Sequence, residues 1–193
     1  MKIFLMYLHE AEKEVEIVKT IFQSALIESI IQFTRFLSAE SINSVVTFMG
    51  HLISFNTEKF SFVRQFIESS GMAIFVRFSL LKMESYDDSS IVEALNLLSQ
   101  IARSSKDTYE HIDSIEPYSD IKSLIKHPDP QIKSRVLNLI GNLCRHSGYF
   151  YGKILEHDLI KDIVQLCSCE DKNTKKFACV ALGNASFHDS TLY

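Results

Sequence analysis

Polar side chains recur at one position of an apolar, helical pattern in the chain. Gln100, Asn142 and Asn184 follow one another at intervals of 42 residues, and His51 occupies the corresponding place before them. A primary amide offers a donor and an acceptor together, and both are needed to bind the backbone of an extended peptide. The same amides could instead bond within the protein and stiffen it. A peptide-binding row and a structural row both stay open at this point.

Charged residues follow the amides near the ends of the same segments. Arg145 and His146 come three and four residues after Asn142, and His188 comes four residues after Asn184. If the amides line a groove, these three residues are placed to form its rim. Histidines at helix ends more often bond to backbone carbonyl groups, so the rim is the less common role.

No other residues form a recognisable catalytic or metal-binding pattern. The sequence lacks nucleotide-binding glycine loops and the motifs of zinc proteases, serine hydrolases and kinases. Asp87–Asp88 and Glu170–Asp171 stand where loops and helix N-caps are expected, and there the helix dipole stabilises a negative charge. Cys144 and Cys179 fall inside apolar helical runs, where a free cysteine packs as a small hydrophobe. We therefore expect no catalytic residue, no metal ion and no cofactor.

The amides belong to a sequence repeat. Residues 120–151 align with residues 162–193 without a gap, at an offset of 42. LNLLSQIARSS at residues 95–105 matches LNLIGNLCRHS at residues 137–147 in the same register, and Tyr109 falls in register with the tyrosine of the next unit. A period of about 40 residues is typical of helical solenoids of the armadillo or HEAT kind. In these, each unit buries its apolar face against its neighbours.

The apolar spacing predicts helices throughout, with few glycine or proline residues to interrupt them. We predict an all-α fold, a right-handed armadillo/HEAT-like helical-repeat solenoid of about four repeats. A charged amphipathic helix within residues 1–24 caps the array or packs on a partner. The repeats are placed approximately at residues 25–70, 71–117, 118–158 and 159–193.

Two local features support this arrangement of helices. Asp129 can cap a long helix that has Pro130 at its first position, where no amide hydrogen is needed. Gly141 and Gly183 recur at one repeat position inside helical segments, although glycine is unfavourable there. Their recurrence indicates close contact between helices rather than flexibility.

The composition is that of a globular chain with a substantial core. The 193 residues include 46% hydrophobic and 23% charged residues, and the formal net charge is −4. A net negative charge provides no positive electrostatic potential that would attract nucleic acid. No apolar run is long enough to cross a membrane, and the run at the amino terminus is too short for a secretory signal. We expect a cytoplasmic protein whose partners are other proteins.

The repeat also carries more specific elements. Residues 136–151 contain GNLCRHS followed by FY, and residues 174–193 contain KFAC, GNA, a histidine and a final LY. These elements resemble the carboxy-terminal armadillo region of the Fused-family serine/threonine kinases. The armadillo repeats of the related uncoordinated-51-like pseudokinases are similar and are a close rival. The resemblance fades upstream, most of all in residues 1–90, and the kinase domain of the family has no counterpart here.

The resemblance implies a site and a cellular role. In armadillo proteins, an asparagine at this place on the third helix lies in a concave groove and brackets the backbone of an extended peptide. The implied groove residues are Gln100, Asn142, Asn184, Arg145, His146 and His188. The implied partners are kinesin and other microtubule-associated or axonemal proteins, in the cytoskeleton and above all in the central apparatus of the ciliary axoneme. The chain is then a non-catalytic scaffold.

Two other functions stay open. The chain could be the regulatory carboxy-terminal part of an active serine/threonine kinase in Hedgehog-type signalling or cytokinesis. Kinase motifs in the coding sequence upstream of Met1 would indicate this. It could also be a peptide carrier of the nuclear-import type, which should pair tryptophans and acidic residues with the amides. The sequence contains no tryptophan.

Overall fold

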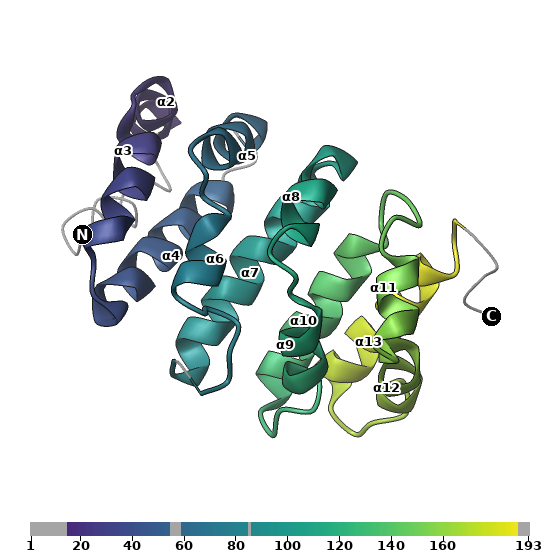
Figure 1. Cartoon of the computed structure of the whole chain (residues 1–193). Coiled ribbons are helices and arrows are strands. Elements are labelled where there is room, and N and C mark those ends of the chain that lie inside the picture. Colours follow the sequence, from purple (N-terminus) through teal and green to yellow (C-terminus); the bar gives the residue numbers. More distant parts are fainter. Residues whose placement is uncertain (1–14, 55–58, 85, 189–193) are drawn as a thin grey trace.

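The computed structural model describes residues 15–54, 59–84 and 86–188 of the chain. Regular structure within these ranges is helical, and Figure 1 shows the helices stacked in chain order from one terminus to the other. The long helices are α4 (Ala39–Ser54), α7 (Asp88–Ser104), α10 (Pro130–Leu143) and α13 (Lys172–Ala185). The short elements are α2 (Val15–Gln23), α3 (Leu26–Phe33), η1 (Thr34–Phe36), α5 (Lys59–Glu68), α6 (Ala73–Arg77), η2 (Lys106–Thr108), α8 (Tyr109–Asp113), α9 (Tyr118–Leu124), α11 (Tyr151–Glu156) and α12 (Leu159–Leu166).

The four long helices form one continuous layer. α7 packs between α4 and α10, and α10 packs between α7 and α13. The short helices cover one side of this layer in pairs, α5 with α6, α8 with α9 and α11 with α12 (Figure 1). Two short helices followed by a long one therefore make one unit of the stack.

Three long helices begin with the same aspartate cap. The carboxylates of Asp87, Asp129 and Asp171 accept hydrogen bonds from backbone N–H groups of the first turn, at 2.7–2.8 Å. These bonds hold the pKa of Asp87 and of Asp171 below its usual range. The cap predicted at Asp129, with Pro130 at the first helical position, is confirmed. Because the aspartates stand 42 residues apart, each cap starts its long helix at the same point of the repeat.

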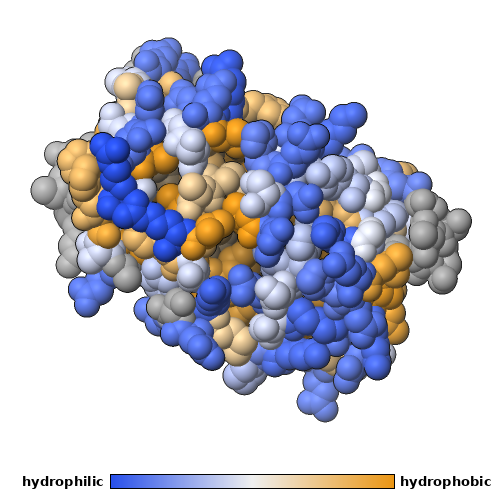
Figure 2. Space-filling view, viewed as in Figure 1, coloured by the Kyte–Doolittle hydropathy of each residue, from blue (hydrophilic) through white to orange (hydrophobic). Residues whose placement is uncertain are grey.

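The core runs through the stack between the long helices and the short ones. Its largest fully buried side chains come from several units and include Phe48, Phe62, Phe66, Tyr109 and Phe150. Outside the core, Figure 2 shows a mostly hydrophilic face, hollowed near its centre where apolar residues are visible. Each unit buries its apolar residues against the next, as a solenoid requires.

The close helix contact predicted from the glycines occurs at only one of them. A Cβ atom added to Gly141 would lie 3.3 Å from the Ala181 Cα atom, so α10 and α13 meet backbone to backbone here. At Gly183 the prediction is wrong, because no described atom of a neighbouring helix lies within 4 Å of such a Cβ atom. On the described chain, α13 has a long-helix neighbour on one side only.

The predicted all-α armadillo-like solenoid is confirmed, with long helices in four successive units. The boundaries at 25–70, 71–117, 118–158 and 159–193 stay our proposal for the repeats. Residues 1–14 of the predicted amino-terminal helix lie outside the described residues, and so does the LY pair at 192–193.

The two glycines allow a matched test of helix packing. Gly183→Ala should raise the free energy of unfolding by up to about 1 kcal/mol, because alanine favours helix and the space is open. Gly141→Leu should lower it by about 1–3 kcal/mol, because α13 must move away. Urea unfolding followed by circular dichroism measures both. Equal stability of the Gly141→Leu variant and the unmodified chain would show that α10 and α13 do not pack this closely.

Candidate functional site

Two buried tyrosines hold the carboxy-terminal ends of α10 and α13. Tyr109 donates a hydrogen bond from its hydroxyl to the Asn142 carbonyl at 2.9 Å and accepts one from the His146 N–H at 3.2 Å. Tyr151, in the next repeat, makes the same pair of bonds at 3.2 and 3.3 Å. Burial raises the pKa of Tyr109, so its hydroxyl keeps the proton that it donates. Each tyrosine therefore fixes where a long helix ends.

The predicted amide row points back along the stack. Nδ2 of Asn142 donates to Ser99 Oγ on α7 at 2.8 Å, and Nδ2 of Asn138 donates to the same oxygen at 2.9 Å. Nδ2 of Asn184 donates instead to the Gly141 carbonyl at 2.7 Å. The partner differs because Gly141 occupies the repeat position of Ser99 and has no side chain. Each amide thus ties its helix to the preceding one through its N–H group.

The histidines at the helix ends make a second tie of the same kind. His146 Nε2 lies 3.1 Å from the Arg103 carbonyl, and His188 Nε2 lies 3.0 Å from the Arg145 carbonyl. Since a carbonyl oxygen only accepts, Nε2 carries the proton in both contacts. Bonding to carbonyls is the more common role of a histidine at a helix end. The side chains of Arg103 and Arg145 remain exposed.

These ties border one surface, which we name the long-helix face. It is formed by four positions that recur at intervals of 42 residues along α7, α10 and α13. Its residues are Glu93, Asn96, Gln100 and Arg103 on α7, Arg135, Asn138 and Asn142 on α10 with Arg145 just after it, and Phe177, Val180 and Asn184 on α13 with Phe187 just after it. A pocket of about 370 Å³ opens between α10 and α13, lined by Pro130, Gln131, Ser134, Arg135, Asp171, Asn173 and Phe177. The face is therefore a shallow surface that continues across several helices.

The structure brings five of the six predicted site residues into one bonded network. The sixth, Gln100, lies in the same row on α7, and its amide makes no hydrogen bond within the described part of the chain. Asn142 is only 7% exposed, whereas Asn184 is half-buried. The bonded residues are Asn142, Asn184, Arg145, His146 and His188. A role of these residues in peptide binding stays a prediction.

Sequence reasoning missed several residues of this face. Asn138 follows Asn96 by 42 residues within the matching LNLL and LNLI segments, so the repeat itself contained that signal. Tyr109 was in register with Tyr151, but its hydroxyl bonds to a carbonyl 33 residues away. No local pattern connects residues at that separation. In the sequence, nothing but its positive charge marked Arg135 as a residue of the site.

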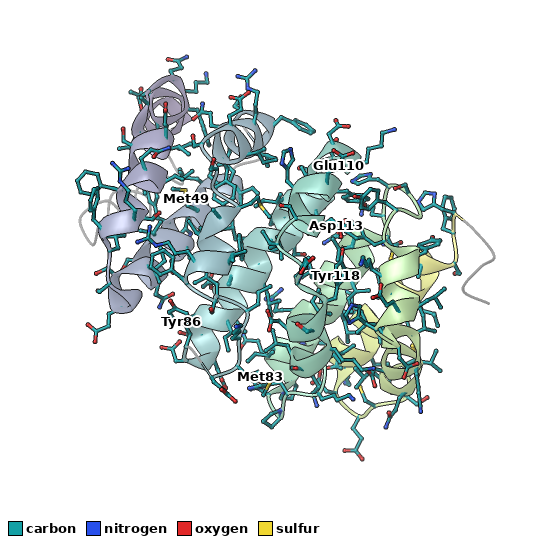
Figure 3. The ribbon with its side chains drawn as sticks, viewed as in Figure 1. Met49, Met83, Tyr86, Glu110, Asp113 and Tyr118 are labelled. Atoms are coloured by element: carbon teal, nitrogen blue, oxygen red, sulfur yellow. The ribbon has the colours of Figure 1, made fainter. Side chains whose placement is uncertain are left out.

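A second polar cluster lies among the short helices. The hydroxyls of Tyr118 and Tyr149 both donate to the Asp113 carboxylate, and Asp113 and Tyr118 lie close together in Figure 3. Burial and this carboxylate raise the pKa of Tyr118 far above its ordinary value. The cluster joins α8, the start of α9 and the loop before α11. We assign it a structural role, because its donors and acceptors satisfy one another.

The cysteines and the carboxylates of the described ranges show no metal-binding geometry. Among the described residues, no group of three His, Cys, Asp or Glu side chains is placed to hold a metal ion. Cys144 is buried, and burial raises its pKa to about 12. Cys179 is exposed, so the burial expected from its apolar run is wrong at that position. Within the described ranges, no helix is long and apolar enough to cross a membrane.

Comparison with solved structures places this geometry among known folds. A designed armadillo repeat protein in complex with the peptide (KR)4 superposes with a TM-score of 0.78, at 16% identity, over 91% of this chain and 70% of the designed one. A computationally designed armadillo repeat protein for modular peptide recognition gives 0.77 at 15% identity, over 91% and 71%. The chain has the armadillo fold. At these identities the similarity shows the fold alone.

Comparison by sequence gives a more limited result. No protein-family model matches the chain. The serine/threonine-protein kinase TIO of Arabidopsis thaliana is 36% identical over 81 residues. The match covers 42% of this chain and 6% of the kinase. The 81 matched residues therefore correspond to a small part of that kinase.

The tyrosine ties can be tested by removing one hydroxyl at a time. Tyr109→Phe should lower the free energy of unfolding by about 1–3 kcal/mol, because a buried carbonyl and a half-buried N–H lose their partner. Tyr151→Phe should cost less, since its bonds are longer and its side chain is less deeply buried. Urea unfolding measures both. No loss of stability in Tyr109→Phe would contradict the tie.

Proposed function

We propose that the chain is a non-catalytic armadillo scaffold that binds extended segments of partner proteins on its long-helix face. The observation that carries this proposal is the arrangement of that face. Side chains of α7, α10 and α13 recur there in parallel rows, and apart from the buried Asn142 they are half-buried or exposed. The ties to neighbouring helices use the amide N–H groups, and the Asn142 and Asn184 side-chain oxygens accept no hydrogen bond within the described chain. They remain as acceptors for a peptide N–H.

The fold supports the same proposal. Solved structures with this fold include a designed protein in complex with a peptide and one designed for peptide recognition. An extended chain presents its backbone groups along its whole length, and a row of amides on packed helices presents partners at ~8–10 Å intervals. The face is shallow, so it suits a chain laid across it better than an enclosed small molecule.

We further propose that this scaffold is the armadillo region of a Fused-like kinase. The GNLCRHS and KFAC elements and the similarity to a plant serine/threonine kinase support this assignment. The partners proposed on this basis are kinesin and other microtubule-associated proteins, most of all in the central apparatus of the ciliary axoneme. An alternative is a regulatory region within an active kinase, which the similarity to a kinase also favours. Kinase motifs encoded upstream of Met1 would support that alternative.

The amide row is tested by separating its two roles. Asn142→Ala removes one bond between α10 and α7 and should lose about 1 kcal/mol of stability, whereas Ser99→Ala removes the acceptor of both Asn138 and Asn142 and should lose at least as much. Only Asn142→Ala also removes the oxygen offered to a peptide, so only it should weaken retention of a mixed-sequence peptide library on the immobilised chain. Asn184→Ala removes the bond to the Gly141 carbonyl, so it should weaken retention and also lose about 1 kcal/mol of stability. Loss of stability without any loss of retention would make the row purely structural.

The partner class is tested by affinity capture from ciliated cells. The chain should retain kinesin or axonemal proteins, identified by mass spectrometry. Asn96→Trp places a bulky side chain on the long-helix face and should abolish capture, because it blocks the path of an extended segment. Glu110→Trp, at an exposed position on α8, is the matched control and should capture normally. Recovery of chaperones alone, or equal capture by the two variants, would count against the proposal.

A further inference from the structure

The charge of the long-helix face changes along the stack. Residues 130–146, which span α10 and its end, contain three Lys or Arg and no Asp or Glu. Residues 172–188, which span α13 and its end, again contain three Lys and no Asp or Glu. The corresponding stretch on α7, residues 88–104, has two carboxylates and one Arg. Of these charged residues, Glu93, Arg103, Arg135 and Arg145 belong to the long-helix face, whose positions on α13 are uncharged. The face is therefore basic at α10, although the whole chain has a net charge of −4.

The pocket between α10 and α13 contains a cation with an unused donor. Arg135 lines this pocket of about 370 Å³, and its buried Nε makes no hydrogen bond within the described chain. That atom is enclosed by protein, so a ligand in the pocket would meet the terminal N–H groups of the guanidinium, which also make no hydrogen bond within the described chain. Asp171 is the carboxylate that lines the pocket, and it already accepts from the Thr174 N–H at 2.7 Å as the cap of α13.

Two further arginines stand along the rim of the same face. Arg103 and Arg145 occupy equivalent positions on successive repeats, and both side chains are exposed. No carboxylate lies within ion-pair distance of either guanidinium group among the described residues. Their backbone carbonyls accept from His146 and His188, so the helix ends that carry them are held in place. The rim thus presents unpaired cations from a rigid support.

We propose that the occupant of the long-helix face is an extended segment rich in Asp and Glu, with its acidic part over α10. This inference rests on the proposed function and adds the chemical class of the partner. A guanidinium fork matches a carboxylate with two parallel hydrogen bonds, and Arg135 and Arg145 offer such forks. Alternate side chains of an extended segment stand ~6.6 Å apart on one side, which brings them within reach of Arg103 and Arg145 at equivalent places on helices ~8–10 Å apart.

The test compares three labelled peptides of about ten residues, long enough at ~3.3 Å per residue to cross three helices. They alternate alanine with glutamate, with serine or with lysine, and each is titrated against the 193-residue chain by fluorescence anisotropy. The glutamate peptide should bind at least about tenfold more tightly than the lysine peptide, because like charges repel. Its affinity should fall steeply as salt shortens the Debye length from ~10 Å towards ~3 Å.

Charge-reversal variants locate the binding. Arg135→Glu and Arg145→Glu should each weaken binding of the glutamate peptide by about tenfold or more, since each replaces an attraction with a repulsion. Arg64→Glu makes the same charge change at an exposed position on α5 and should leave binding unchanged. Circular dichroism checks that all three variants remain folded.

The outcomes separate this inference from the function on which it rests. Equal or tighter binding of the serine or lysine peptide would overturn the acidic partner and leave the peptide-binding scaffold standing. If Arg64→Glu weakens binding of the glutamate peptide as much as Arg135→Glu does, the peptide does not bind at the long-helix face. That result would overturn the inference. Failure of all three peptides to bind would contradict peptide binding itself.

Discussion

The packing of each long helix against the next is the contact on which the rest of the structure depends. α10 lies between α7 and α13, and at Gly141 its backbone leaves no free space before the backbone of Ala181. Helices this close must keep one register, because a shift would drive side chains into each other. Groups at equivalent positions therefore meet equivalent surroundings, as the ties made by Tyr109 and Tyr151 show.

The same register divides the polar groups of the long helices into two sets. The amide N–H groups of Asn142 and Asn184 and Nε2 of His146 and His188 point along the stack and hold it together. Amide oxygens and the arginine side chains remain on the long-helix face. A rigid face that uses its donors internally is preorganised, so a bound segment does not have to order it. This favours recognition by a fixed scaffold.

Much of this arrangement could be predicted from the chain because it repeats. The sequence alone predicts the 42-residue period, the aspartate caps and the position of the amide row. Repeat equivalence gave a wrong answer at Gly183 and the apolar run gave one at Cys179, and both residues lie on α13. A position inherits the surroundings of its counterpart only when its helix has neighbours on both sides. On the described chain, α13 has a long neighbour on one side only.

The sequence by itself determined the helices, their caps and their period, because these depend on residues within one turn or on the same residue one repeat away. Only the tertiary structure decided which partner each polar group takes. Asn142 and Asn184 are equivalent in sequence, yet one bonds to a serine hydroxyl and the other to a glycine carbonyl. That choice depends on the residue that packing brings alongside. The unused donor of Arg135 depends in the same way on what surrounds it in space.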